Sequence, residues 1–267
     1  MMRRLKLLQA VGRLIIPGYK FQYPQLCWWQ DPEFESYLAA FHEQDEFNAG
    51  RRFTLYQLTR LVAGVEGDTA ECGVYQGFSS FLICLATSSS QRTHFAFDSF
   101  EGLSRPGEED GSHWKPGDLG TPMERAMHNL RRFPNVSWHK GWIPDRFPDV
   151  EQRRFALVHI DVDLHSPTRD SMEFFYPRVN PGGIIICDDY ACTTCPGATK
   201  AVDEYLADKP EKMIMLPCGG GFLIKGTPTA VTPSCIVPAH ASSFAKIGSP
   251  SEGNQGSQVT SEVSALH

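Results

Sequence analysis

The sequence has no apolar run that reaches the roughly 20 residues of a transmembrane helix, so no membrane partner is expected. Its first residues come nearest to a targeting segment, because a basic start is followed by apolar residues as far as Ile16. Gln9 and Arg13 interrupt this run, and no small-residue cleavage site follows it. We therefore expect a short amphipathic helix that packs on the domain, rather than a signal peptide or a membrane contact.

Positive charge is also scarce. The chain has 25 Lys and Arg residues against 31 Asp and Glu residues, which gives a net charge of −6. A surface that binds nucleic acid needs basic side chains to neutralise phosphates. Nucleic acid is therefore not expected as a partner.

The C-x-x-C of Cys192 and Cys195 has no second cysteine pair or suitably spaced histidines to complete a structural zinc site, although the chain holds eight cysteines. Cys72, Cys84 and Cys187 lie in apolar or strand-like segments, which is typical of small buried side chains in a reducing cytoplasm. We expect a cytoplasmic protein. For the C-x-x-C we expect a loop that carries two thiols, with zinc binding and redox chemistry as the alternatives.

Strand-like and helix-like segments alternate along most of the 267 residues, and 41% of the residues are hydrophobic. The predicted strands are residues 68–75, 94–98, 136–140, 155–161, 184–187, 212–217 and 221–225. The predicted helices are residues 53–62, 78–86 and 123–133, a helix opened by Ser166 as N-cap with Pro167, and residues 198–206. This alternation predicts an α/β fold with a doubly wound, seven-stranded, mostly parallel sheet.

Three parts of the chain differ in character. Residues 1–52 read as a helical and loop-like N-terminal cap, rich in aromatic side chains, and residues 53–225 hold the α/β domain. In residues 226–267 only Lys246, Glu252 and Glu262 are charged, and Ser, Thr, Pro, Gly and Ala dominate. Such a segment has little to bury, so we expect a disordered tail, and a chain ending at Lys225 or Gly226 should keep its fold.

The first strand leads into a turn that carries Glu71, Gly73 and Gly77. Glycine lets the backbone approach a ligand, and the following helix offers free N–H groups. The spacing is not that of the G-x-G-x-x-G dinucleotide fingerprint but the looser E-x-G-x-x-x-G that methyltransferases use around the cofactor. Asp98 ends the next strand, where an acid in a doubly wound fold binds ribose hydroxyls.

Four aspartates follow the fourth and fifth buried strands. Asp161 and Asp163 close one strand, and Asp188 and Asp189 close the other. Carboxylates brought together raise one another's pKa unless a cation neutralises them. Hard oxygen ligands favour Mg²⁺, Ca²⁺ or Mn²⁺, so the sequence predicts a divalent metal site at this edge of the sheet.

In this order, the segments AECGVYQG, FAFDSFEGL, GWIPDRFPD, HIDVDLHSPT, PGGIIICDDY and KAVDEYL resemble the macrocin O-methyltransferase family. The resemblance runs from about Phe53 to Lys225. It implies a Rossmann-like fold, S-adenosyl-L-methionine and Mg²⁺ as cofactors, and a sugar hydroxyl on a macrolide or related natural product as acceptor. A small molecule that bears a hydroxyl is thus the expected partner.

The resemblance also implies the site residues. Asp161, Asp188 and Asp189 would bind the metal. The expected cofactor contacts are Glu71, Gly73, Val74, Tyr75 and Gly77 in the turn, Asp98 and the adjacent Ser99, Gly141 and Trp142 near the adenine, and Asp161. The chain departs from the family where it has His165 in place of Tyr and Gln76-Gly77-Phe78 in place of an Arg-Gly-Gly-like turn, and the first change bears on the substrate contacts.

For methyl transfer to a hydroxyl we expect Asp161 as proton acceptor, with His165 and then His139 as weaker candidates for the base. The glycine- and proline-rich residues 102–122 would act as a lid that keeps water out. A metal-dependent glycosyltransferase, which also uses an Asp-x-Asp at a strand end, and a non-catalytic protein that kept the fold are the alternatives. The methyl acceptor stays open, as does the choice between a monomer and a homo-oligomer.

Overall fold

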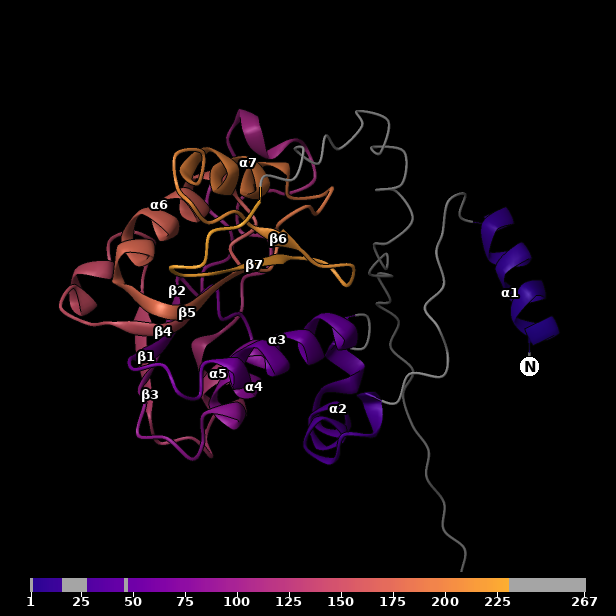
Figure 1. The fold of residues 1–267 in the computed structure, drawn as a ribbon, viewed down its shortest axis with the longest axis horizontal. Coiled ribbons are helices and arrows are strands. Elements are labelled where there is room, and N and C mark those ends of the chain that lie inside the picture. The colour runs from indigo at the N-terminus through magenta and orange to yellow at the C-terminus, as the bar shows by residue number, and fades with distance from the viewer. Residues whose placement is uncertain (1, 16–27, 46–47, 231–267) are drawn as a thin grey trace, which may run out of the picture.

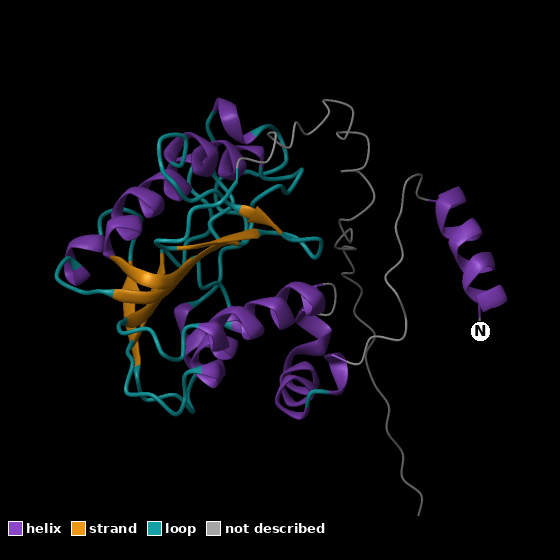
Figure 2. Cartoon of the chain, viewed as in Figure 1, coloured by secondary structure: helices purple, strands orange, loops and turns teal. Residues whose placement is uncertain are grey.

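The computed structural model describes residues 2–15, 28–45 and 48–230. At its centre is a seven-stranded sheet with the order β3-β2-β1-β4-β5-β7-β6 (Figures 1 and 2). The strands are β1 (Asp68–Cys72), β2 (His94–Asp98), β3 (Val136–Lys140), β4 (Phe155–Ile160), β5 (Val179–Cys187), β6 (Ile214–Met215) and β7 (Gly221–Ile224). The first five run parallel, and β7 is antiparallel to both of its neighbours. The predicted fold class is therefore confirmed.

Helices cover both faces of the sheet, as the alternation of elements requires. Figure 1 shows α3 (Ala49–Leu61), α4 (Phe78–Ala86) and α5 (Met123–Asn129) on one side of the sheet, with α6 (His165–Phe175) and α7 (Pro196–Tyr205) on the other. Strand β4 is buried along its whole length because it lies in the middle of the sheet and is covered twice. This packing fixes the carboxyl ends of the parallel strands at one edge.

Alternate residues of the central strands supply the two halves of the core. Val158 and Ile185 pack with Met172 of α6 and Val202 of α7. On the other face, Ile184 and Ile186 pack with helix residues that include Leu55, Leu58 and Ile83. Leu55 and Leu58 belong to the apolar spacing that predicted a helix over residues 53–62, and the helix itself begins earlier, at Ala49.

Two further helices lie in the N-terminal region. Phe34, Tyr37 and Phe41 of α2 (Pro32–Asp45) pack against Phe78 and Phe81 of α4, so this part covers one end of the domain. The expected helix near the start of the chain is α1 (Met2–Ile15), but its described apolar side chains, among them Leu14, are exposed, and Figure 1 shows it away from the sheet. The expectation that it packs on the domain is therefore not met. Among the described residues, no helix is both long and apolar enough to cross a membrane.

The start of α6 differs from the prediction that Ser166 is its N-cap. The N-cap is Leu164, and Ser166 is already inside the helix. The cap is supplied from a distance, because the backbone N–H of His165 donates to Oδ1 of the buried Asp110, 2.6 Å away. Asp110 closes a short 3₁₀ helix (Glu108–Asp110) in the predicted lid, a partner that lies too far along the chain for local pattern reasoning.

The described domain continues past Lys225. The backbone N–H of Gly226 donates to Oε1 of Glu211 at 2.6 Å, and that of Thr229 donates to the carbonyl of Pro210 at 3.0 Å. A boundary after Lys225 therefore cuts through ordered contacts. Residues 231–267 lie outside the described residues, so their predicted disorder stays a prediction.

We expect a chain that ends at Ala230 to unfold at the same temperature as the full chain, since residues 231–267 have little apolar surface to bury. A chain that ends at Lys225 should be less stable, because it loses the hydrogen bonds that Gly226, Thr227 and Thr229 donate to the domain, which contribute about 0.5–1.5 kcal/mol each. Thermal unfolding of the two truncated chains measures the difference. A large loss of stability in the chain that ends at Ala230 would contradict the predicted tail.

Candidate active site

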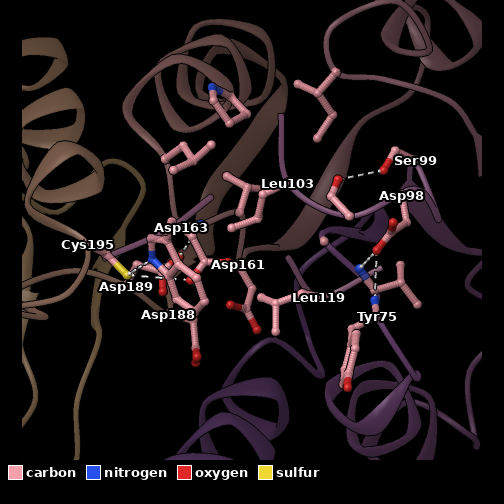
Figure 3. Close-up of a pocket in the computed structure, with 18 of the residues that line it drawn as sticks. Tyr75, Asp98, Ser99, Leu103, Leu119, Asp161, Asp163, Asp188, Asp189 and Cys195 are labelled. Carbon is pink, nitrogen blue, oxygen red and sulfur yellow. Dashed lines mark hydrogen bonds between the residues drawn. The ribbon is translucent and has the colours of Figure 1, made fainter. Parts of the chain in front are cut away.

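A cavity of about 430 Å³ opens at the carboxyl ends of β1, β2, β4 and β5. This is where open α/β sheets bind ligands, and the volume is in the range of small-molecule sites. Figure 3 shows two groups of residues on opposite sides of it, Tyr75 with Asp98 and the aspartates that follow β4 and β5, with Leu103 and Leu119 between them. The cavity can thus hold a ligand that reaches from one group to the other.

The turn after β1 can be built only with glycine at position 73. Gly73 has a φ of +85°, and a Cβ there would lie 1.7 Å from the carbonyl oxygen of Asp161. The turn then continues through Tyr75, with a φ of 51°, to Gly77, the left-handed N-cap of α4. A non-glycine residue at position 73 would have to push β4 away from β1, so this glycine holds together the two sides of the cavity.

Asp98 organises the same turn from the neighbouring strand. Its Oδ2 accepts the backbone N–H groups of Val74 and Tyr75, both at 2.8 Å, and its Oδ1 accepts that of Phe100 at 2.6 Å. A carboxylate offers about four acceptor positions, so one on Oδ1 remains for a ligand. The backbone carbonyl of Asp98 also accepts the N–H of Gly141 at 2.9 Å, which brings residues 141 and 142 to this side of the cavity.

Eight of the ten predicted cofactor contacts line the cavity, and two do not. The lining residues are Gly73, Val74, Tyr75, Asp98, Ser99, Gly141, Trp142 and Asp161. Gly77 lies at the start of α4 outside the lining, and Glu71 is fully buried in β1. The structure therefore does not bring these two predicted residues into the cavity.

The register of the sheet explains why the aspartates meet. Ile160 of β4 pairs with Cys187 of β5, so Asp161 and Asp188 are the next residues on adjacent strands. The N–H of Asp188 donates to the carbonyl of Ile160 at 2.8 Å, and the N–H of Asp161 donates to that of Cys72 at 2.9 Å. Asp163 and Asp189 follow on the loops and also line the cavity.

Two arginines from α3 face these acids, and neither was predicted from the sequence. Nη1 of Arg51 lies 2.5 Å from Oδ2 of Asp188, and Nη1 of Arg52 lies 3.8 Å from Oδ2 of Asp161. Their helix precedes the sheet, and no local spacing links residues 51 and 52 to residues 161 and 188. The one signal that could have found them is a helix placed over the carboxyl edge of a predicted parallel sheet.

Glu71 and His159 form a buried chain of charges that ends at Asp188. Nδ1 of His159 lies 2.8 Å from Oε1 of Glu71, and Nε2 lies 3.4 Å from Oδ1 of Asp188. Burial disfavours the imidazolium, but the hydrogen bonds that His159 donates to Asp188 and Glu71 outweigh it and raise the pKa of His159 to about 10. Burial likewise opposes the ionised Glu71, yet the hydrogen bonds of His159 and His94 hold its pKa well below its usual range. Glu71 therefore helps to keep His159 positively charged, and His159 in turn stabilises the ionised form of Asp188.

Nearby positive charges do not fully balance the negative charge of the remaining aspartates. Burial and the charge of Asp188 raise the pKa of Asp161 to about 8, and burial raises that of Asp163 to about 6 and that of Asp189 well above its usual value. Asp188 is the exception: burial acts against its ionised form, but His159 and the two arginines lower its pKa.

This charge pattern fits a divalent cation. Five carboxylates (Glu71, Asp161, Asp163, Asp188, Asp189) face three cationic groups (Arg51, Arg52, His159), so the ionised cluster has two negative charges in excess. Hard oxygen donors suit Mg²⁺. The predicted ligands are divided between two groups, however. Asp161 and Asp188 lie with His159, and Asp189 lies with Asp163 and Cys195, the ligand atoms in each group being within 4.8 Å of one another.

Neither histidine considered as a base reaches the cavity. His165 is not in the lining, and its Nε2 lies 3.3 Å from Oε2 of Glu204. His139 is held between Asp149, at 2.9 Å from Nδ1, and Ser137, at 3.0 Å from Nε2. Their proposed roles have no supporting contact in the described structure, whereas Asp161 lines the cavity.

The predicted lid forms one wall of the cavity. Gly102, Leu103, Ser104, Trp114 and Leu119 belong to the lining. The segment is braced internally, because the N–H of Leu103 donates to the carbonyl of Asp118 and the N–H of Gly117 donates to that of Leu103, both at 2.8 Å. Leu103 and Leu119 thus place apolar surface between the two polar ends of the cavity (Figure 3).

Comparison with known proteins identifies a family and several relatives of this chain. A family model described as Macrocin-O-methyltransferase (TylF) matches residues 54–216. The 8-demethyl-8-(2,3-dimethoxy-alpha-L-rhamnosyl)-tetracenomycin-C 4'-O-methyltransferase of Streptomyces olivaceus is 34% identical over an alignment of 154 residues, and the match covers 52% of this chain and 59% of that protein. The demethyldecarbamoylnovobiocin O-methyltransferase of Streptomyces niveus is 32% identical over an alignment of 174 residues, and the match covers 59% of this chain and 66% of that protein. The matched segments thus span less than two thirds of either relative.

Solved structures share the fold. The O-methyltransferase NovP superimposes with a TM-score of 0.57 at 29% identity, covering 66% of this chain and 79% of that chain. The calicheamicin methyltransferase CalS11 superimposes with a TM-score of 0.62 at 20% identity, covering 84% of this chain and 93% of that chain. The second likeness concerns the fold alone.

Proposed function

The chain belongs to the macrocin O-methyltransferase family, and we propose on this basis that it transfers a methyl group from S-adenosyl-L-methionine to a hydroxyl of a small molecule, with a divalent metal at the acceptor side. We infer that the acceptor is a sugar or a glycosylated natural product, as the names of its relatives indicate for those proteins. The observation that carries the proposal is the division of one cavity into a turn side and an aspartate side, because methyl transfer must hold a donor and an acceptor end to end.

The turn side would hold the cofactor. Asp98 has one acceptor position left on Oδ1, which suits a ribose hydroxyl, and Gly73 lets the ligand approach the backbone. Gly141 and Trp142 would border the adenine. The other two predicted residues of the turn would not contact the cofactor. Gly77 would set the shape of the turn as the N-cap of α4, and Glu71 would act through its contact with His159.

The aspartate side would hold the acceptor. Asp161, Asp188 and Asp189 would bind Mg²⁺, which when bound supplies a Lewis acid that lowers the pKa of a hydroxyl. Asp161 would take the proton of that hydroxyl, because it lines the cavity beside the metal site. Arg51 and Arg52 would hold Asp188 and Asp161 in place. His165 stays a candidate base without a contact in the cavity.

The lid would exclude water from the reacting atoms. Leu103, Leu119 and Trp114 line the cavity and would cover the sulfonium group and the acceptor oxygen. The proposal includes a cytoplasmic location, supported by the free and buried thiols of Cys72, Cys84 and Cys187.

Methyl transfer itself can be tested with S-adenosylmethionine labelled on the methyl group. The acceptors would be a rhamnosyl tetracenomycin and a demethyldecarbamoylnovobiocin, the molecules named for the two relatives. We expect label to move to at least one glycosylated acceptor in the presence of Mg²⁺. Hydrolysis or transfer of a sugar nucleotide by the same protein, with no labelled product, would favour the glycosyltransferase instead.

Replacing Asp98 with Ala should weaken S-adenosylhomocysteine binding by about tenfold to a hundredfold, since hydrogen bonds to a charged group contribute about 1.5–3 kcal/mol. Asp98→Asn should lose less, because its amide oxygen can still accept from Val74 and Tyr75. Isothermal titration measures both variants. Asp118→Asn is a suitable control, because Asp118 is outside the cavity lining. Unchanged affinity in the Ala variant would move the ribose site elsewhere.

A further inference from the structure

Cys192 and Cys195 stand in a tight turn at the edge of the cavity. The backbone N–H of Cys195 donates to the carbonyl of Cys192 at 3.2 Å, and Cys195 is the N-cap of α7. A turn closed by this hydrogen bond brings its first and fourth Cα atoms to within about 7 Å. The Cα separation in a disulfide is about 4.4–6.8 Å, so the turn can accept the bond with little movement of the backbone.

The side chains of the turn are close to each other as well. Oγ1 of Thr194 lies 3.1 Å from Sγ of Cys192 and 3.6 Å from Sγ of Cys195, so one hydroxyl contacts both thiols. Both cysteines line the cavity, and Cys192 is partly exposed. Among the described cysteines, these two are the pair that a single turn joins, whereas Cys72, Cys84, Cys187 and Cys218 lie in separate parts of the chain.

Cys195 also joins the aspartate side of the cavity to the lid. Its thiol donates to Oδ1 of Asp163 at 3.5 Å and accepts the indole N–H of Trp114 at 3.4 Å. Figure 3 shows Cys195 directly beside Asp163 and Asp189. A covalent change at this sulfur therefore alters the contact with Asp163 and the contact with Trp114 of the lid together.

We propose that Cys192 and Cys195 form a reversible disulfide in the wall of the cavity, and that this bond releases the lid from Cys195. The oxidant is a disulfide of low molecular mass such as glutathione disulfide. The thiolate of one cysteine attacks it to form a mixed disulfide and releases one glutathione thiolate. The second cysteine, as its thiolate, then attacks the mixed disulfide, so that the Cys192–Cys195 bond forms and a second glutathione leaves. The protein loses two protons and two electrons, and the oxidant is reduced to two thiols.

The Cys192–Cys195 disulfide removes the hydrogen bonds that Cys195 makes to its neighbours. A disulfide sulfur has no hydrogen to donate to Asp163, and the sulfur must turn towards Cys192 and away from Trp114. Residues 102–122 then lose this anchor to α7. This inference concerns the thiols and holds whether or not the proposed methyl transfer is correct.

The test is a redox titration of the full chain in mixtures of reduced and oxidised glutathione, quenched with acid and alkylated. Cleavage before Asp189 and Asp203 releases a peptide in which Cys192 and Cys195 are the only cysteines. We expect this peptide to lose the mass of two hydrogen atoms and to escape alkylation under oxidising conditions, and to recover with reductant. Cys218→Ser should behave like the natural chain, and Cys192→Ser should give only a mixed disulfide.

Hydrogen exchange of the same samples reports the lid without an activity assay. Oxidation should speed exchange of the amides of Leu103 and Gly117 by several-fold. Cys195→Ser should abolish this effect, because the serine hydroxyl cannot form a disulfide and can keep the contacts with Asp163 and Trp114. A peptide that stays alkylated on both cysteines in excess glutathione disulfide would overturn the proposal. Formation of the bond with unchanged exchange in the lid would overturn its second part.

Discussion

Asp161→Asn should reduce methyl transfer by about 10²–10⁴-fold, the range that a positioned general base contributes. The residue lines the cavity between the two strands that carry the acids, and it is the only one of the candidate bases that does so among the described residues. Turnover would be measured with the acceptor that the labelled-methyl experiment identifies. Affinity for S-adenosylhomocysteine should change by no more than a few-fold, because the backbone of Asp161, which packs against Gly73, is kept.

Removal of the metal with EDTA should act on turnover in the same way as Asp161→Asn. Mg²⁺ should restore activity to the natural chain but not to the variant, and Mn²⁺ should substitute because it accepts the same ligands. Asp170→Asn provides the control, since Asp170 also lines the cavity but pairs with Arg169, 2.7 Å away. Full activity in metal-free protein would show that the aspartates are not metal ligands.

Glu71→Gln should lower the free energy of unfolding by about 3–5 kcal/mol at neutral pH, the cost of breaking a buried ion pair from one side. Glu71 is fully buried, and the change removes the negative charge beside His159 and leaves one acceptor oxygen for the two partners His159 and Ser80. At about 2–4 °C for each kcal/mol in a chain of this size, the melting temperature should fall by roughly 6–20 °C. Glu124→Gln, on the exposed surface, should leave it unchanged.

The pH dependence of this loss follows from the two partners. The pKa of Glu71 is lowered on folding, so its contribution is present above the ordinary glutamate range and is lost in acid. The pKa of His159 is raised to about 10, so its contribution is present below its ordinary value of 6.5 and is lost as the pH rises towards 10. The difference between the natural chain and Glu71→Gln should therefore be greatest between about pH 4.5 and 6.5 and shrink on both sides. A difference independent of pH would contradict the charged pair.

The sequence was sufficient to predict the sheet and the gathering of the aspartates. Both follow from rules that act along or between neighbouring strands: buried strands read as apolar runs, and residues after adjacent parallel strands meet at one edge. Asp161 and Asp188 meet because Ile160 pairs with Cys187, and that register follows once the two strands are known to be neighbours.

Contacts between distant elements could not be predicted in this way. Arg51 and Arg52 reach the acids from a helix that precedes the sheet, and Asp110 caps α6 from within the lid. Glu71 was expected at the ligand because it ends a strand, but the pleat turns its side chain into the protein towards His159. A shift of one residue in the register turns a strand side chain from one face of the sheet to the other. The sequence does not determine the register to within one residue, so it does not show which way Glu71 points.

The measurement that tests the central claim most directly is isothermal titration of the full chain with S-adenosylhomocysteine, once with Mg²⁺ and once with EDTA. We predict one binding site per chain in both titrations, with affinities within a few-fold, because in our proposal the turn side of the cavity would hold the cofactor without the aspartates that would bind the metal. A nucleoside diphosphate should give no heat of binding. Binding of a nucleoside diphosphate that requires the metal, with no binding of S-adenosylhomocysteine, would contradict the proposed methyltransferase.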